Sequence, residues 1–368
     1  MPDTPAVLVA DAFEVDAGAL RRLSQEPLGA GTVTGFRLPD ETIVYADTSG
    51  LPVPAETGWV AVGEGRLWLH PADPHLPALA PAAFGHATAI LLGRLGIRGV
   101  GSPQLVGYRP GRRAVLRVPV DGGTVWVKVV RPHRVEHLVT VHARLRDHGL
   151  PVPAVRGWSR DGLLVLDPAS GTPAIESGAD PEEVLDAVDR LRARLSGAPL
   201  ADPARTSLRA RAAWYADLLR RARPDLAATV TATAEAIAQA GPGRQAETIH
   251  GDLHLGQLFL GGGDVTGLID IDTAGVGDGA DDSAAFVGHL VASEALTTRP
   301  AAAERARALV RAAWARWGSQ PQVAELTAAH LLGHAVSADD AVRQQGLIAH
   351  ARALVDGAEP FAADPGRR

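Results

Sequence analysis

The fold is decided by the stretch IHGDLHLGQ at residues 249–257, which leads into two short apolar runs. These runs flank a Gly-Gly-Gly-Asp turn at residues 261–264, a pattern typical of an antiparallel hairpin. Pairing around that turn sets Gln257 opposite the end of the second run, where Asp270 lies. Asp252 is in the loop just before. The sequence therefore predicts that Asp252, Gln257 and Asp270 gather at one end of a hairpin.

This group of side chains indicates phosphoryl-transfer chemistry. Oxygen ligands at a strand end suit Mg²⁺, which takes few protein ligands and completes its shell with phosphate and water. Asp252 offers the carboxylate that general-base help to a hydroxyl requires. Lys128 is the single lysine among 36 basic residues. It lies in the second run of a predicted hairpin at 114–130, where strand alternation places it on the face opposite Val125, Val127 and Val129. Because Arg and Lys are not interchangeable where a compact point charge is required, this lysine is expected to bind nucleotide phosphates.

The run His250-Gly-Asp252-Leu-His254, followed by Gln257 and Ile269-Asp270, resembles the aminoglycoside phosphotransferase and choline kinase group. Its Leu-Gly-Gln ending is similar to the maltokinase and glucosamine kinase branch. The resemblance implies an α+β, protein-kinase-like two-lobed fold. It does not cover the first 80 or so residues, where short β-like runs broken by Pro, Gly and Asp predict an extra N-terminal β-rich cap. The expected divisions are a cap at 1–85, a β-rich nucleotide-binding N-lobe at 86–167 and a helical C-lobe at 168–368.

Residue roles follow from this resemblance. Asp252 is the catalytic base, and Gln257 and Asp270 are the metal ligands, with Gln257 in the place where the family usually has Asn. The supporting residues of the catalytic loop are His250, His254 and Asp282.

The nucleotide contacts are expected from the N-lobe and the segment that follows it. Pro168 has no N–H, so the adenine donor is expected to be Ala169 and the acceptor the carbonyl of Asp167. The phosphate loop around residues 108–114 has one glycine, which leaves backbone amides and Arg112 or Arg113 to hold the phosphates.

Two assignments stay open at this level. Kinase-like folds pair the strand lysine with a helix glutamate, and Glu136 is the only acid near the start of the next helix. The apolar pattern instead places Leu138 in the expected register, so the glutamate is either Glu136 or absent. Asp278 and Asp281 either face a cationic acceptor or are solvated loop acids.

Composition limits the partners. The net charge is −6, and the charged residues form no run of one sign, which argues against a nucleic-acid partner. The sequence contains no uncharged apolar stretch long enough to predict a membrane span. Cysteine is absent, so thiolate catalysis and a disulfide framework are excluded. The first residues lack the pattern of a secretory signal. We expect a cytoplasmic enzyme with a small-molecule partner; the sequence does not indicate its oligomeric state.

The predicted function is an ATP- and Mg²⁺-dependent kinase that phosphorylates a hydroxyl of a sugar, amino sugar or aminoglycoside. Two alternatives remain. One is a non-catalytic nucleotide-binding pseudokinase. The other is a metal-dependent hydrolase with ligand-like spacing at His250, Asp252, His254 and Asp270.

Overall fold

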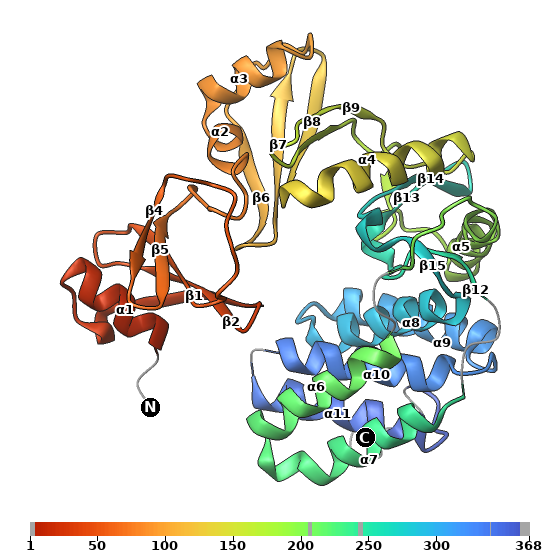
Figure 1. Ribbon diagram of the computed structural model, residues 1–368. Helices are drawn as coiled ribbons and strands as arrows, with labels where there is room; N and C mark the ends of the chain where they lie inside the picture. The colour runs from red at the N-terminus through yellow and green to blue at the C-terminus, as the bar shows by residue number, and fades with distance from the viewer. Residues whose placement is uncertain (1–3, 205–207, 242–245, 339, 361–368) are drawn as a thin grey trace. The chain divides into compact units, whose positions relative to one another are not determined.

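The structure is a computed structural model that describes residues 4–204, 208–241, 246–338 and 340–360. It divides into two compact units (Figure 1). The first contains residues 1–143 and 153–168, and the second contains residues 144–152 and 169–368. The first unit is rich in β-strands and the second is mainly helical, so the predicted α+β class is confirmed.

The first unit begins with an antiparallel sheet that the short β-like runs of the sequence predicted. Its strands lie in the order β1-β2-β3-β5-β4, and helix α1 (Thr4–Phe13) contacts β3. Val9 of α1 shares a buried cluster with Phe36 and Val44 of the sheet. The strands are β1 (Arg21–Leu28), β2 (Gly31–Arg37), β3 (Ile43–Asp47), β4 (Trp59–Val62) and β5 (Gly65–Leu69).

A second antiparallel sheet of the first unit contains Lys128. Its order is β6-β7-β8-β10-β9, and the predicted hairpin at 114–130 is its β7–β8 pair. Alternation along β8 places Val125, Val127 and Val129 in the cluster that also contains helices α2 (Leu79–Ala83) and α3 (Gly85–Gly93). The strands are β6 (Gln104–Arg109), β7 (Arg113–Val120), β8 (Gly123–Val130), β9 (Val155–Trp158) and β10 (Leu163–Leu166).

The opposite face of β8 packs against helix α4 (Pro132–Asp147). Val130 and Leu164 of the sheet form a buried cluster with Leu138 of the helix. Lys128 is two residues before Val130 and pairs with Leu164, so strand alternation puts it on this same face. The sequence pattern therefore predicted the face of β8 that carries the lysine.

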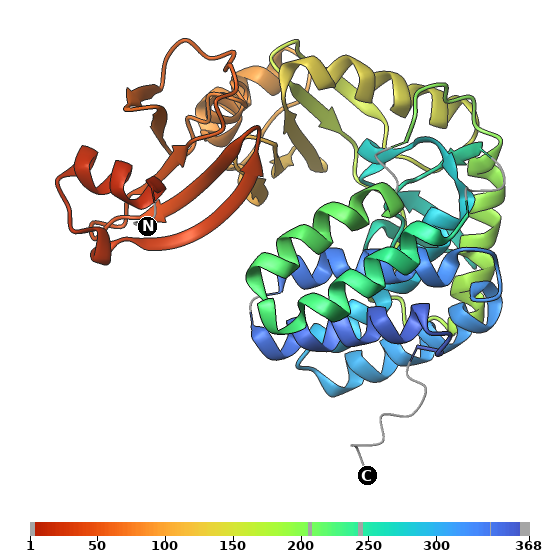
Figure 2. The same ribbon diagram turned by 60° about the horizontal axis from the view of Figure 1, so that its bottom comes forward.

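The second unit is built around α8, which is buried along most of its length. Helix α10 contacts α6, α8 and α11, and Figure 2 shows α6 and α7, in green, beside the blue helices near the C-terminus. The helices are α5 (Pro181–Ser196), α6 (Leu208–Ala222), α7 (Ala227–Gln239), α8 (Gly279–Leu296), α9 (Pro300–Trp317), α10 (Val323–Ser337) and α11 (Ala341–Val355).

Two small sheets interrupt these helices where the sequence predicted a hairpin. One has the order β11-β13-β14 and the other is the pair β12-β15. Their strands are β11 (Thr172–Pro173), β12 (Ala246–Ile249), β13 (Leu258–Gly261), β14 (Asp264–Leu268) and β15 (Gly275–Asp278). Within the described ranges, no helix is both long and apolar enough to span a membrane.

Asp73 joins the two sheets of the first unit. Its carboxylate accepts hydrogen bonds from the Tyr108 hydroxyl at 2.8 Å, the Gly111 N–H at 2.7 Å and the His75 N–H at 2.9 Å. The side chain is nearly fully buried. Burial raises the pKa of Asp73, against the opposing effect of these donors. The turn between β6 and β7 is therefore bonded to the segment that follows β5.

We expect Asp73→Ala to destabilise the first unit strongly. The substitution leaves the Tyr108 hydroxyl and two N–H groups without their acceptor, and each buried unsatisfied donor costs about 1–3 kcal/mol. The free energy of unfolding should fall by about 3 kcal/mol or more, as measured by urea denaturation. Asp40→Ala is the control, because Asp40 is exposed and accepts one bond, from the Thr42 N–H. Equal losses in the two variants would contradict this account.

Candidate active site

The loop after β12 is held by Asp282, in the first turn of α8. One oxygen of its carboxylate accepts the His250 N–H and the other accepts the Gly251 N–H, both at 2.8 Å. Asp282 is only 2% exposed, so water does not compete for these bonds. Gly251 has φ +78°, and a Cβ there would lie 2.7 Å from the Thr273 carbonyl oxygen. The loop that presents Asp252 therefore has a fixed backbone and requires glycine beside it.

The imidazole of His250 also contacts the backbone. It is fully buried, and its Nε2 donates to the Ile269 carbonyl at 3.1 Å. The Thr273 hydroxyl donates to the His250 carbonyl at 2.8 Å. These bonds connect the loop to the chain on both sides of Asp270. His250 is therefore occupied in holding the loop against the hairpin.

The hairpin brings Gln257 and Asp270 to one end, as the turn pattern predicted. Leu258 pairs with Leu268, and the Ile269 N–H donates to the Gln257 carbonyl at 3.0 Å. Asp270, the next residue, has a left-handed backbone with φ 60°. A non-glycine residue in this region is uncommon and is often found at functional sites.

His254 links Asp252 to this end of the hairpin. The Gln257 side-chain oxygen accepts the His254 N–H at 3.1 Å, while the His254 ring accepts the Gly256 N–H. Burial lowers the pKa of His254 to about 3, and the carboxylates of both Asp252 and Asp270 act on it in the opposite direction. The three predicted oxygen-bearing side chains therefore share one neighbourhood within the second unit.

Two histidines face the Asp252 carboxylate. Oδ1 lies 3.7 Å from Nε2 of His289, on α8, and 3.8 Å from Nε2 of His330, on α10. Burial opposes ionisation of Asp252, but these imidazoles outweigh it and hold the pKa of the carboxyl below its usual range. Asp252 is therefore ionised at neutral pH and can accept a hydrogen bond.

The sequence analysis did not identify the histidines on α8 and α10. A signal was present, since His330 and His334 are four residues apart and such pairs share one face of a helix. His289 comes from a different helix, and only tertiary structure shows that it lies with them.

Asp278 and Asp281 differ in their surroundings. Asp278 caps α8 by accepting the Ala280 N–H at 3.1 Å. Asp281 is 6% exposed, and its Oδ1 has no hydrogen-bond partner in the described part of the chain. Burial and then the charges of Asp278 and Asp282 raise the pKa of Asp281 to about 7. The interpretation of Asp281 as a solvated loop acid is therefore wrong.

The structure corrects the expectation for Glu136. Its side chain is 66% exposed and lies 3.7 Å from the Arg160 guanidinium. Leu138 takes the buried position on α4. Lys128, on β8, is only 7% exposed. Since helix periodicity turns Glu136 toward solvent, it does not form the buried lysine–glutamate pair of kinase-like folds.

Arg112 is also placed differently from the expectation. Its guanidinium donates to the Pro27 carbonyl and lies 3.6 Å from Glu26, both on β1. Arg109 pairs with the same Glu26 at 2.9 Å. The guanidinium of Arg112 is therefore bound to strand β1 of the first sheet, although the sequence predicted that it holds phosphates. Arg113 is the first residue of β7 and is half-buried.

The predicted adenine contacts lie where the chain passes between units. Asp167 is near the end of the first unit, and Ala169 begins the last segment of the second. The Asp167 N–H donates to the Ala154 carbonyl at 2.9 Å, and its carboxylate meets Arg156 at 3.2 Å. The carbonyl of Asp167 and the N–H of Ala169 remain predicted adenine contacts.

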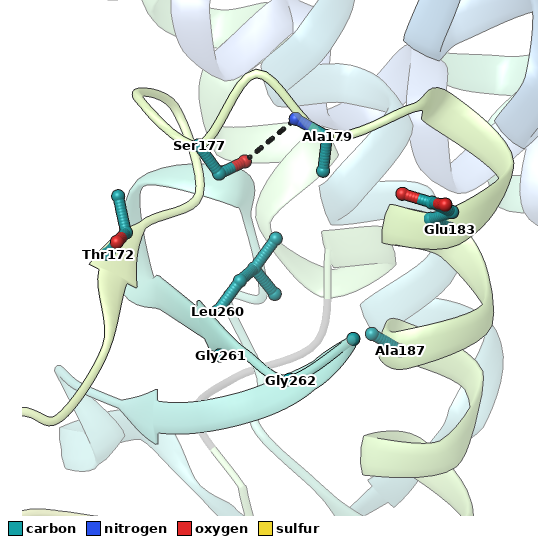
Figure 3. Close-up of a pocket in the computed structure, with 9 residues that line it drawn as sticks. Thr172, Ser177, Ala179, Glu183, Ala187, Leu260, Gly261 and Gly262 are labelled. Carbon is teal, nitrogen blue, oxygen red and sulfur yellow. Dashed lines mark hydrogen bonds between the residues drawn. The ribbon is translucent and has the colours of Figure 1, made fainter.

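A small cavity lies at the other end of the β13–β14 hairpin (Figure 3). In its lining, Ser177 accepts the Ala179 N–H at 3.3 Å, and Glu183 is the one ionisable side chain. The rest of the lining comes from Thr172, Ala187, Leu260 and the glycine turn. Four residues of strand, about 13 Å, separate this turn from Gln257. The cavity is therefore distinct from the site around Asp252.

A comparison with known families identifies the chain. The phosphotransferase enzyme family matches residues 106–332, well over half of its length. This chain belongs to that family. The predicted enzyme class and kinase-like fold of the phosphotransferase are confirmed.

Solved structures resemble this chain at low sequence identity, and one with a TM-score above 0.5 shares its fold. Aminoglycoside phosphotransferase APH(4)-Ia, as a thermostable mutant in apo form, is 15% identical, with a TM-score of 0.53. The match covers 72% of this phosphotransferase and 97% of that chain. A macrolide 2'-phosphotransferase type I is 22% identical, covering 74% and 97%, with a TM-score of 0.48. No curated protein matches the sequence.

The hydrolase alternative loses support. Among the described residues, the metal-ligating side chains that converge within 4.8 Å are His289, His330 and His334. They are not the set that the alternative requires. His250, a member of that set, is bonded to a backbone carbonyl. The family match also favours a phosphotransferase over a hydrolase.

We expect Asp281→Asn to change how the stability of the phosphotransferase depends on pH. Folded Asp281 keeps its proton up to about pH 7, whereas an ordinary Asp loses it near 3.8. Wild-type stability therefore falls as pH rises from about 4 to about 7, because ionisation is easier in the unfolded chain. The variant cannot ionise, so its stability relative to wild type should increase by up to a few kcal/mol across this window.

Thermal melts at pH 5 and pH 8 measure this effect. The melting temperature of Asp281→Asn minus that of wild type should be clearly larger at pH 8. Asp161→Asn, at an exposed turn, is the control for the substitution itself. A difference between Asp281→Asn and wild type that does not change with pH would contradict the shifted pKa.

Proposed function

We propose that this phosphotransferase transfers the γ-phosphate of ATP, with Mg²⁺, to a hydroxyl of a sugar, amino sugar or aminoglycoside. The observation that carries the proposal is the loop held by Asp282, which presents the ionised Asp252 beside the hairpin end with Gln257 and Asp270. Complexes of APH(4)-Ia variants with hygromycin B and ADP or AMP-PNP support the substrate and nucleotide classes. The Leu-Gly-Gln ending at Gln257 favours a sugar-type acceptor of the maltokinase and glucosamine kinase kind.

The residues at the hairpin end fit Mg²⁺. Gln257 offers an amide oxygen and Asp270 a carboxylate, the hard donors that Mg²⁺ prefers. The Gln257 oxygen accepts the His254 N–H, which fixes its direction and leaves a second lone pair. We propose that these two residues hold the ion, which neutralises phosphate charge when it is bound. His250, His254 and Asp282 keep the loop and the hairpin in register around it.

Asp252 is proposed to orient the acceptor hydroxyl. The acceptor oxygen forms a bond to the γ-phosphorus as the bond to the bridging oxygen of ADP breaks, and the hydroxyl proton passes to Asp252. A carboxylate of lowered pKa is a weak base. This is sufficient, since phosphoryl transfer has a loose transition state in which positioning matters more than early proton removal.

Residues of the first unit, together with Ala169 directly after it in the chain, are proposed to bind the nucleotide. Lys128 and Arg113 would contact phosphates, and Asp167 and Ala169 would contact adenine. We retain the division into a cap at 1–85, an N-lobe at 86–167 and a C-lobe at 168–368 as part of the proposal. A cytoplasmic location and a small-molecule hydroxyl acceptor, with neither nucleic acid nor membrane as partner, complete the proposal.

We expect Asp252→Asn to lower turnover by a factor on the order of 10² to 10⁴, because the amide cannot take the proton. Acceptor-dependent ADP release measures it. Asp264→Asn, at the far turn of the same hairpin, is the matched control and should keep wild-type turnover. Normal turnover in Asp252→Asn would refute the role of this carboxylate.

Lys128→Arg should also abolish turnover, although the charge is kept. The guanidinium is larger than the ammonium and does not fit a position that is only 7% exposed. Arg117→Lys makes the reverse exchange at an exposed position of the neighbouring strand β7 and should be neutral. The measurement is ADP release at saturating Mg-ATP. If Lys128→Arg works as well as wild type, a phosphate-binding ammonium is not required.

A panel of sugars, amino sugars, aminoglycosides and amino alcohols tests the acceptor class. The proposal expects ADP release that depends on one of the first three groups. Stabilisation by Mg-ATP in thermal melts without turnover on any acceptor would instead support the pseudokinase alternative.

A further inference from the structure

The histidines beside Asp252 form a second possible ion site, separate from the hairpin end. His289 comes from α8, and His330 and His334 come from one face of α10. One ring nitrogen from each lies within 4.8 Å of those of the other two. The ring centroids are 4.4–4.9 Å apart. Three imidazoles from two packed helices therefore converge on one point.

The nitrogens at this point form no hydrogen bond among the described residues, although two of them face the Asp252 carboxylate at 3.7 and 3.8 Å. Nε2 of His289, His330 and His334 is buried in each case, with no hydrogen bond in the described part of the chain. His330 is only 7% exposed. Leaving a buried polar atom unsatisfied costs about 1–3 kcal/mol, so three together are expensive unless a ligand completes them.

The ligand type suits a transition metal. The neutral imidazole ring is the form that coordinates metal. Imidazoles prefer Zn²⁺ and its neighbours in the first transition row, whereas Mg²⁺ prefers oxygen.

Asp252 can provide a fourth ligand. Its Oδ1 is 3.7 and 3.8 Å from Nε2 of His289 and His330. In a tetrahedral zinc site with bonds of about 2.0–2.1 Å, ligand atoms lie about 3.3–3.4 Å apart. The two Asp252–histidine separations exceed this by a few tenths of an ångström, and the histidine nitrogens, within 4.8 Å of one another, would also have to move closer on binding an ion.

We propose that His289, His330 and His334 bind a divalent transition-metal ion of the Zn²⁺ type, with Asp252 as the fourth ligand. A bound ion engages the carboxylate that the acceptor hydroxyl needs, so metal binding inhibits phosphoryl transfer. This inhibition rests on the proposed function, whereas the binding of metal does not.

Co²⁺ tests the binding directly, since tetrahedral Co²⁺ absorbs strongly in the visible range. Tag-free protein, treated with a chelator and without nucleotide, is titrated with Co²⁺ alone. We expect one ion per chain and loss of its absorption on adding Zn²⁺. His289→Gln and His334→Gln should each weaken Co²⁺ binding by more than about 100-fold. Loss of a residue that only supports a ligand already weakens metal affinity by up to about 100-fold, and loss of a direct ligand should cost more. His86→Gln removes an exposed imidazole and should change nothing.

The other outcomes are equally decisive. Wild-type protein that binds no Co²⁺, or His334→Gln protein that binds it equally well, overturns the proposal; circular dichroism confirms that each variant is folded. Asp252→Asn should still bind but with a changed spectrum, and an unchanged spectrum removes Asp252 from the ligand set. With Mg-ATP and acceptor, buffered Zn²⁺ should inhibit wild type at least tenfold more than it inhibits His334→Gln. If metal-free wild type shows no turnover, the proposed function fails while the Co²⁺ titration still decides the metal site.

Discussion

The site depends on one constraint, the pair of hydrogen bonds from the His250 and Gly251 amides to Asp282. A carboxylate with both oxygens used in this way fixes the distance and the orientation of the loop relative to α8. Because α8 is buried along most of its length, the loop takes its position from a well-packed helix of the second unit. Asp252 and the histidine on α8 therefore have a defined separation, whatever the longer loops of the chain do.

The local elements could be predicted because each has a short-range cause. Alternation in 124–130 placed Lys128 on the face opposite the Val125 cluster, and the glycine turn brought Gln257 and Asp270 together. Strand period and turn chemistry act over few residues and do not require the rest of the fold. The same holds for Leu138, which occupies the buried register that its spacing indicated.

Long-range contacts account for what the sequence did not predict. Glu26 precedes Arg112 by more than eighty residues, and no local pattern indicates that they meet. Aspartate is usually exposed, and the sequence around Asp281 is typical of a loop. Tertiary packing nevertheless buries Asp281 in the first turn of a helix. His289 and His330 likewise belong to different helices. In each case the deciding quantity is desolvation, which is a property of the folded neighbourhood and not of the residue type.

Asp73 has a consequence for the boundary of the segment that matches the family. The family match begins at residue 106, yet two donors shortly after it, Tyr108 and Gly111, use an acceptor more than thirty residues earlier. A fragment that contains only the matched residues would lack the acceptor for the hydrogen bonds of Tyr108 and Gly111. The ring of Tyr108 would also lose the first sheet, against which it packs. The N-terminal sheet and the segment after it are thus an integral wall of the neighbouring sheet.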